Sequence, residues 1–263
     1  MATTTRQRPL RRLLGYTAFA VAGALALLTG ACAAPVHASA ATPKPTTCKA
    51  RKIIYFGAYR FDNDLFAGMK GPSCITVSDP SLTIDDNYKA QGPVVAYPAI
   101  RYGPYYGSGD TESVLPERVT RTGHLTLSAR ATGKASGVYL TDVDAWFYPG
   151  RSVAGHGNGE LVIGLKYTGW APGAGWRRMS IAHHWYWARH SMTCVPGTTD
   201  CWPITVLRAT SQVTSRSLRM PTFLWHMRKA GWLGKGEWLG SVAFGTECWS
   251  GCKGLTDSLA VSS

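Results

Sequence analysis

Two glutamates in this 263-residue chain have a setting that suits acid chemistry. Glu160 lies in the segment GELVIGLKY, whose alternation predicts a strand with Glu160, Val162, Gly164 and Lys166 on one face. Glu247 lies in SVAFGTECW, which alternates in the same way near the end of the chain. Two carboxylates on strands, both near rings that could stack on sugars, are typical of glycosidic bond cleavage by paired acids.

A third acid, Asp144, shares a face with Asp142 in the strand-like segment SGVYLTDVDAWFYP. The connection 149–158 is rich in glycine, so this segment and the one that holds Glu160 are predicted to be antiparallel neighbours. A hairpin symmetric about Ser152 would place Asp144 opposite Glu160. Two carboxyl groups that close would share a proton, and the pKa of one of them would be raised.

Each candidate also has a purely structural interpretation. Glu160 could be a solvated residue at a sheet edge, Glu247 a turn acid between two disulfides, and Asp144 an acceptor for backbone N–H groups. Large rings anchor small β-domains, so the aromatic candidates for sugar stacking are equally open to two interpretations. These candidates are Trp146, Trp249, Tyr105 and Tyr106. Most other acids are expected in turns, among them Asp62, Asp64, Asp79, Asp85, Asp86, Asp110 and Asp200.

The scaffold that must position these residues is predicted to be an all-β sandwich of two antiparallel sheets, because short β-rich runs recur between turn residues. The expected strands are 52–59, 74–77, 94–102, 124–129, 137–147, 160–167, 179–188, 204–212, 240–249 and 254–261. One short helix is expected at 221–230, since Pro221 suits a first turn and Gly231 follows the last. No repeat or change of composition interrupts 48–263, which predicts one domain.

The first 40 residues have the plan of a secretory signal peptide, with four arginines, an apolar run and small residues up to a cleavage site near Ala38–Ala40. Residues 41–47, ATPKPTT, are expected to be a short linker. The expected location is extracellular. Three alternatives stay open: a twin-arginine route suggested by Arg11-Arg12, a lipid anchor on Cys32 and an uncleaved membrane span.

Charge indicates the kind of partner. Removing residues 1–40 leaves 24 Lys and Arg against 15 Asp and Glu, a net charge of +9. A basic exported protein can associate weakly with anionic cell-wall polymers. Nucleic acid is not an expected partner, because the basic residues are scattered and the export signal argues against it.

Six cysteines remain after Cys32 is set aside, and an even number in an exported chain predicts disulfides before metal sites. The pairing stays open from sequence alone. Proximity favours Cys48 with Cys74, Cys194 with Cys201 and Cys248 with Cys252. The spacing of His183, His184 and His190 fits no structural zinc pattern, so no metal and no cofactor is expected.

A series of short motifs runs through the chain: Asn63-Asp-Leu-Phe66, Cys74-Ile-Thr-Val77, Tyr97-Pro-Ala-Ile100, Gly103-Pro-Tyr-Tyr-Gly107, Leu115-Pro116, Asp144-Ala-Trp-Phe147, Glu160-Leu-Val-Ile163 and Gly245-Thr-Glu-Cys-Trp249. In order and spacing they resemble glycoside hydrolase family 12, the secreted endo-β-1,4-glucanases and xyloglucanases. The resemblance implies a concanavalin-like β-jelly roll of two curved sheets, with a polysaccharide cleft on the concave one. It implies Glu160 as nucleophile, Glu247 as acid/base and Asp144 as the carboxyl that hydrogen-bonds the nucleophile.

The resemblance also implies substrate contacts. Asn63, Phe66 and Val162 are expected to contact the glycan, together with the four stacking candidates. Phe66 and Gly164 stand where the family has tryptophan, so two sugar platforms are expected to be reduced or lost.

The leading hypothesis is therefore a monomeric, retaining endo-glycosidase that acts on β-1,4-glucan. One alternative keeps the sandwich without the reaction, as a carbohydrate-binding or wall-associated protein. The other is a lipid-anchored envelope protein that adheres to anionic polymers through its charge.

Overall fold

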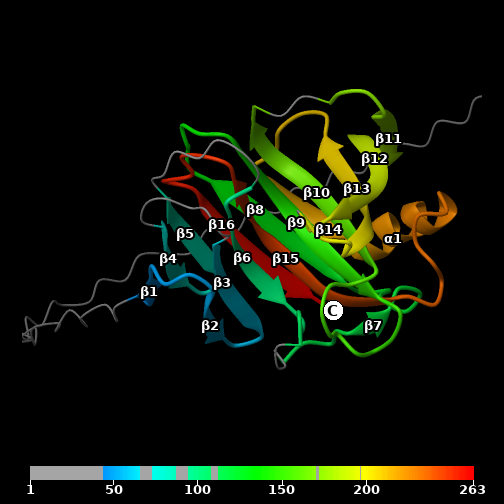
Figure 1. Cartoon of the computed structure of the whole chain (residues 1–263), viewed down its shortest axis with the longest axis horizontal. Coiled ribbons are helices and arrows are strands. Elements are labelled where there is room, and N and C mark those ends of the chain that lie inside the picture. The colour runs from blue at the N-terminus through cyan, green and yellow to red at the C-terminus, as the bar shows by residue number, and fades with distance from the viewer. Residues whose placement is uncertain (1–43, 66–72, 87–93, 108–111, 170–171, 196) are drawn as a thin grey trace, which may run out of the picture. The chain divides into compact units, whose positions relative to one another are not determined.

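The computed structural model describes residues 44–65, 73–86, 94–107, 112–169, 172–195 and 197–263. These residues form two β-sheets and one helix, which confirms the predicted all-β jelly-roll sandwich (Figure 1). The predicted signal peptide with Cys32, and Phe66 of the predicted substrate contacts, lie outside the described residues. No helix within the described ranges is long and apolar enough to cross a membrane.

The smaller sheet has six strands. In spatial order they are β1 (Thr46–Thr47), β4 (Ser73–Ser78), β5 (Ser81–Asp86), β16 (Thr256–Ser262), β8 (Thr126–Thr132) and β14 (Ser215–Arg219). Strand β8 shows the alternation of a sheet with one buried face, because Leu127, Ala129 and Ala131 are buried while Ser128 and Arg130 are exposed.

The larger sheet has ten strands, and it carries the candidate acids. In spatial order it contains β11 (Arg177–Ile181), β12 (His184–Cys194), β13 (Cys201–Ala209), β10 (Gly159–Thr168), β9 (Tyr139–Tyr148), β15 (Trp238–Cys248), β6 (Ala96–Tyr102), β3 (Tyr59–Leu65) and β2 (Lys52–Phe56), with β7 (Glu117–Arg118) beside β15. The long strands β9, β10 and β15 lie side by side in Figure 1. The pairing of β10 with β13 is parallel, whereas β9 pairs antiparallel with both its neighbours.

The hydrophobic core lies between the two sheets. Phe61, Ile75, Leu127, Phe147 and Phe244 from both sheets are fully buried in one cluster. Burying a side chain of this size contributes about 1.5–3 kcal/mol. Core packing also decides which residues of the larger sheet face away from the core, because neighbours along a strand point to opposite sides. That second side is called the outer face below.

Helix α1 (Met220–Lys229) agrees closely with the predicted helix. Pro221 lies in the first turn, and Gly231 follows the end with φ 75°, a left-handed conformation that glycine adopts without strain. Phe223 packs edge-on against Tyr186 of β12, with 5.8 Å between ring centroids. The helix therefore packs on the core-facing side of the sheet, against β11 and, through Phe223, against β12.

Two of the predicted strands are hairpins. The run 52–59 reverses at Gly57, where φ is 54°, and continues as β3. The run 179–188 reverses at Ala182 and His183, where φ is 50° and 64°. Alanine and histidine are not turn signals, so this second reversal could not be predicted from composition.

Several polar residues predicted in turns or in the linker lie in strands. Asp62 and Asp64 belong to β3, and Asp85 and Asp86 to β5. Asp86 is fully buried, and the hydroxyl of Ser73 donates a hydrogen bond to its Oδ1. Thr46 and Thr47, assigned to the linker from sequence, form β1. A hydrogen bond between the hydroxyls of Thr46 and Thr76, at 3.0 Å, ties this strand to β4.

Three disulfides join Cys48 to Cys74, Cys194 to Cys201 and Cys248 to Cys252, the pairs that proximity favoured. Cys194 and Cys201 lie opposite each other at the end of the β12–β13 hairpin.

Candidate active site

The pairing of three neighbouring strands places the candidate acids on one face. Glu160 of β10 pairs with Trp146 of β9, and Glu247 of β15 pairs with Leu140 of β9. Asp144 lies between Trp146 and Leu140 along β9 at alternate positions. Directly paired residues share a face, so all three carboxyl groups project from the outer face.

The centre of the β9–β10 hairpin lies one residue later than predicted, so each residue of β10 has a partner on β9 two positions from the predicted one. The β9–β10 pairing is centred on Val153 rather than Ser152, so Trp146 and not Asp144 lies opposite Glu160. The partner of Asp144 is Val162. The difference amounts to two positions along the strand, and an even shift keeps Asp144 on the face of Glu160.

Lys166 does not share the face of Glu160, which corrects the simple alternation. A β-bulge between Gly164 and Lys166 turns the following residues over, and Lys166 pairs with Thr141 on the core side. Its ammonium group donates a hydrogen bond of 2.6 Å to the carbonyl of Gly133. The bulge therefore removes a cation from the neighbourhood of the acids.

Glu160 and Asp144 form a tight pair, each held by an indole. The Nε1–H of Trp202 donates to Glu160 Oε2 at 2.6 Å, and the Nε1–H of Trp146 donates to Asp144 Oδ2 at 2.7 Å. Burial first, and then the charge of Asp144, raises the pKa of Glu160 well above its ordinary value. Burial raises the pKa of Asp144 to about 6, against the opposing effect of Arg101. The interaction between the two carboxyl groups raises the pKa of Glu160 and lowers that of Asp144, so the proton of the pair resides on Glu160.

Glu247 is suited to donate a proton near neutral pH. Burial, and then the charge of Asp144, raises its pKa to about 8. A carboxyl group with that pKa is mostly protonated at pH 7, as a general acid must be.

A fourth carboxyl group, that of Asp142, completes the cluster. Asp142 is fully buried, and the hydroxyl of Tyr97 donates to its Oδ1 at 3.0 Å. Burial, and then the charges of Glu247 and Asp144, raises the pKa of Asp142 well above its ordinary value. Alternation had placed Asp142 on the face of Asp144 without a role. Since four acids crowd one face, several must be protonated at neutral pH.

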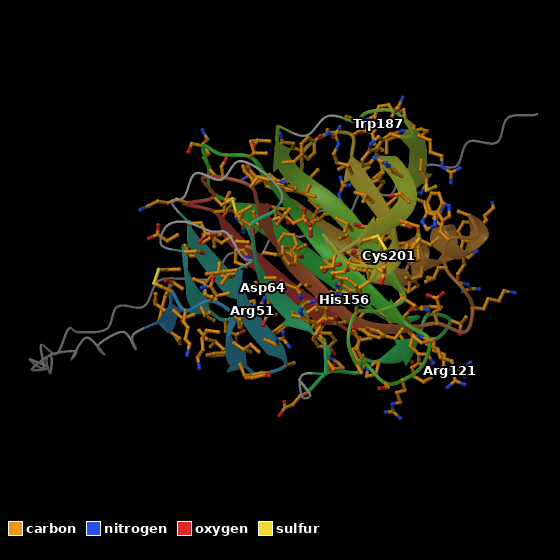
Figure 2. All side chains as sticks on the ribbon, in the orientation of Figure 1. Arg51, Asp64, Arg121, His156, Trp187 and Cys201 are labelled. Atoms are coloured by element: carbon orange, nitrogen blue, oxygen red, sulfur yellow. A yellow bond between two sulfur atoms is a disulfide. The ribbon has the colours of Figure 1, made fainter. Side chains whose placement is uncertain are left out.

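Five rings gather beside Glu160 and Asp144. The cluster consists of Tyr105, Tyr106, Trp146, His156 and Trp202. His156 stacks on Trp202 with 4.7 Å between centroids, and Tyr106 meets His156 edge-on at 4.9 Å. In Figure 2 His156 lies near the centre of the view, between Asp64 and Cys201. Tyr105, Tyr106 and Trp146 were expected from sequence, whereas His156 and Trp202 were missed.

On the other side of the acids lies a buried arginine that sequence reasoning also missed. Arg101 shares the partner Ala243 with Asp144, which places it in the same row of the outer face. Its Nε–H donates to Asp62 Oδ2 at 3.2 Å, and its guanidinium carbon lies 3.7 Å from the centre of the Tyr105 ring. The charge of Arg101 lowers the pKa of Asp144, so it favours ionisation of that carboxyl group.

Of the three other predicted substrate contacts, one lies on the face of the acids, one points away from it and one lies beyond the end of β15. Val162 lies on the outer face opposite Asp144. Asn63 is fully buried with its amide donating to the carbonyls of Lys49 and Ser73, so its side chain faces away from the acids. Trp249 follows the end of β15 and is partly buried, and its backbone N–H donates to the carbonyl of Val138.

A side chain at Gly164, such as the tryptophan that the resemblance would place there, would require Leu140 to shift. A Cβ at Gly164 would lie 2.8 Å from Leu140 Cδ1 and 3.6 Å from Arg208 Cγ. Arg208, its partner on β13, reaches over the ring of Tyr167 with 4.4 Å from guanidinium carbon to centroid. An arginine thus occupies the region next to the missing indole.

A cavity of about 700 Å³ adjoins this site without containing the acids. It lies between segments 104–107, 112–116 and 151–154, next to Tyr105 and Tyr106. The acids themselves lie on the sheet face beside it.

Replacing Trp202 by phenylalanine tests the role of its indole N–H. The hydrogen bond to Glu160 lowers the pKa of that carboxyl group, so its loss is expected to move the acid limb of the pH–rate profile to higher pH. At neutral pH we expect kcat/KM to fall by about 10- to 100-fold, the effect of one hydrogen bond to a charged group. Trp225→Phe, at an exposed ring on α1, is the matched control. An unmoved acid limb would mean that Trp202 only packs.

The fold and the site define a class of protein, the two-layer jelly roll with a row of four acids on the outer face of its larger sheet, of which Asp142 and Asp144 are buried and Glu160 and Glu247 are half-buried. Solved structures of this class match the chain. A metagenome-derived glycoside hydrolase family 12 endoglucanase has 26% identity and a TM-score of 0.73 over 84% of this chain and 97% of its own. An endoglucanase from Rhodothermus marinus has 25% identity and a TM-score of 0.69 over 84% and 97%. A family 12 xyloglucanase from Bacillus licheniformis has 22% identity and a TM-score of 0.75 over 83% and 99%.

The fold of this chain is that of glycoside hydrolase family 12, which confirms the fold that the sequence motifs predicted. No model of a protein family matches the sequence, and no curated protein matches it.

Proposed function

We propose that this chain is a secreted, retaining endo-glycosidase that hydrolyses β-1,4-linked glucan. The observation that carries the proposal is the division of proton states on one sheet face. Glu160 and Asp144 hold one proton between them, while Glu247 has a pKa of about 8. One carboxylate and one carboxylic acid facing the same bond are what double displacement requires.

In the first step Glu160 attacks the anomeric carbon and Glu247 transfers its proton to the leaving glycosidic oxygen. The carbon–oxygen bond to the leaving sugar breaks, and a glycosyl ester of Glu160 forms. In the second step Glu247, now ionised, removes a proton from water, and the hydroxyl displaces Glu160 from the sugar. Asp144 has the lower pKa of the pair, about 6, so its carboxylate accepts the proton that Glu160 must release before it attacks.

The pairing of the strands supports one direction for the glycan. The partners of Glu160 and Glu247 on β9 are Trp146 and Leu140, six residues apart, so the two acids flank Asp142 and Asp144 along the strand direction. A glycan whose scissile bond lies between the two acids therefore runs across the strands. It passes over β13 and β12 on one side and over β6 and β3 on the other.

The stereochemical outcome tests the proposal directly. Proton NMR of the first products released from a soluble xyloglucan or cello-oligosaccharide is expected to show the β-anomer before mutarotation. Double displacement retains configuration when the carboxyl groups are about 5 Å apart, whereas inversion needs about 6.5–9.5 Å to admit water. Initial release of the α-anomer would exclude Glu160 as a nucleophile.

A non-catalytic carbohydrate-binding protein is the second candidate, and the absence of an indole at Gly164 favours it. The two candidates differ in the release of reducing sugar from xyloglucan, carboxymethyl cellulose or mixed-linkage glucan. Secretion, a monomeric state and cleavage near Ala38–Ala40 belong to the proposal. Secretion is supported by the three disulfides, because disulfides form in oxidising compartments. A mature N-terminus near Ala41, found by mass spectrometry, would exclude acylation of Cys32.

A further inference from the structure

The sheet edge formed by β11, β12 and β13 is strongly basic. These three strands carry four arginines, Arg177, Arg178, Arg189 and Arg208, and no acid. On the opposite side of the acids, by contrast, Arg60 and Arg101 are both paired with Asp62. The arginines of β3 and β6 therefore have a carboxylate partner, whereas β11, β12 and β13 carry no acid beside their arginines.

Part of this charge lies on the same face as the acids. One row of directly paired residues crosses the sheet from its edge to the acids: Arg178, Trp187, Arg208, Gly164 and Asp142. The next row consists of Arg189, Val206, Val162 and Asp144. Paired residues share a face, so Arg178, Arg189 and Arg208 lie on the outer face together with Trp187. These four residues are called the basic end below.

The basic end lies on the path of the glycan. Strands are about 4.8 Å apart, so Arg178 is about 19 Å from Asp142 along its row and Arg189 about 14 Å from Asp144 along the other. A chain that crosses the strands from the acids toward β11 passes over both arginines.

The side chains of the basic end are arranged as a recognition surface. Arg178 and Arg189 are exposed, whereas Arg208 is only 5% exposed and is held against the ring of Tyr167 at 4.4 Å. Arg178 lies against the ring of Trp185 with 4.8 Å from guanidinium carbon to centroid. Strands β11, β12 and β13 contain no Asp or Glu, so no carboxylate on these strands competes for the guanidinium groups of Arg178 and Arg189. Guanidinium groups bind carboxylates in a bidentate way that neutral sugars cannot match.

We propose that the basic end is a subsite for an acidic sugar, so that the preferred glycan carries carboxylate groups several sugar units from the bond that is cut. This inference deepens the proposed function. The same region lacks the indole at Gly164 that would bind a neutral ring by stacking, and Arg208 lies beside that position. In this subsite, charged guanidinium groups would bind the sugar where a stacking indole is missing.

Binding to defined oligosaccharides tests the inference without relying on turnover. The Glu160→Gln protein is titrated calorimetrically with cellohexaose and with the same hexamer oxidised to carboxylates at C6. At about 10 mM salt, where charges act over about 30 Å, we expect the oxidised hexamer to bind about 10-fold more tightly. At about 150 mM salt the advantage should shrink, because the screening length falls to about 8 Å.

Variants of equal charge locate the effect. The double variant Arg178→Gln and Arg189→Gln is expected to lose the preference for the oxidised hexamer and to keep its affinity for cellohexaose. The matched control changes Arg121 and Arg130, which are both exposed, to Gln and should keep the preference within about 2-fold. Figure 2 shows Arg121 and Trp187 at opposite ends of the view.

Two results would overturn the inference: equal affinity for the two hexamers, or an equal loss in both double variants, which would mean attraction by net charge alone. A preference for the oxidised hexamer in a protein that hydrolyses no glucan would refute the proposed reaction and leave the acidic subsite standing.

Discussion

Glu160→Gln is expected to lower kcat on soluble glucan by about 10⁴-fold or more, the scale on which enzymes lose activity when a nucleophile is removed. An amide cannot form the glycosyl ester, although its single oxygen can still accept the hydrogen bond from Trp202. Reducing-sugar release measures the loss. The substitution keeps size and shape, and it removes an acid whose charged form is penalised by burial, so the melting temperature should not fall.

Glu117→Gln is the matched control for this experiment, because Glu117 lies on β7 and pairs with Leu239 of the same strand that carries Glu247. Its activity should equal that of the unmodified protein. If Glu160→Gln still hydrolysed glucan, Glu160 could not be the nucleophile, and the double-displacement mechanism through Glu160 would be refuted.

Glu247→Gln is expected to reduce hydrolysis of polysaccharide by about 10²- to 10⁴-fold, the usual contribution of a general acid. The loss should be far smaller for an aryl glycoside whose leaving group needs no proton. The pH dependence gives a second signature. Glu247 must be protonated to start the reaction and has a pKa of about 8, so the rate of the unmodified protein falls as pH rises through about 8. The variant has no such group, and its basic limb should disappear.

The acid limb should remain in Glu247→Gln, because it arises from the first ionisation of the Glu160 and Asp144 pair, where the pKa of Asp144 is about 6. A kinetic pH profile on an aryl glycoside measures both limbs. Persistence of the basic limb would point to another acid, and Asp142 is the nearest candidate, since its pKa is raised by the charge of Glu247.

Much of the site could be predicted because strand alternation is a local property. Alternation alone placed Glu160 and Val162 on one face and Asp142 with Asp144 on another strand, and each pair does lie on the outer face. Alternation failed at Lys166, where a bulge exchanges the two faces. In the segment LVIGLKY only Gly164 is a residue type that can indicate a bulge. That glycine had already been explained in another way, as a position where the family has a sugar-binding tryptophan.

Contacts that depend on the order of strands could not be predicted. Trp202 reaches Glu160 because β13 lies parallel to β10, and a parallel neighbour requires the chain to leave and return through β11 and β12. Arg101 comes near Asp144 because β15 lies between β6 and β9, and Ala243 of β15 pairs with both residues. The reversal at Ala182 was hidden for a different reason, since alanine rarely adopts positive φ.

The place of β15 has a consequence for how the molecule assembles. This strand comes from residues 238–248, yet it lies in the interior of the larger sheet between β9 and β6. Until it arrives, β9 and β6 each present an open edge with unpaired backbone groups, a template for aggregation. Such long-range pairing is slow. A chain synthesised from its N-terminus therefore carries two unpaired strand edges until residues 238–248 have been made. The acid cluster forms only when β15 pairs with β9 and β6, because Glu247 lies on β15.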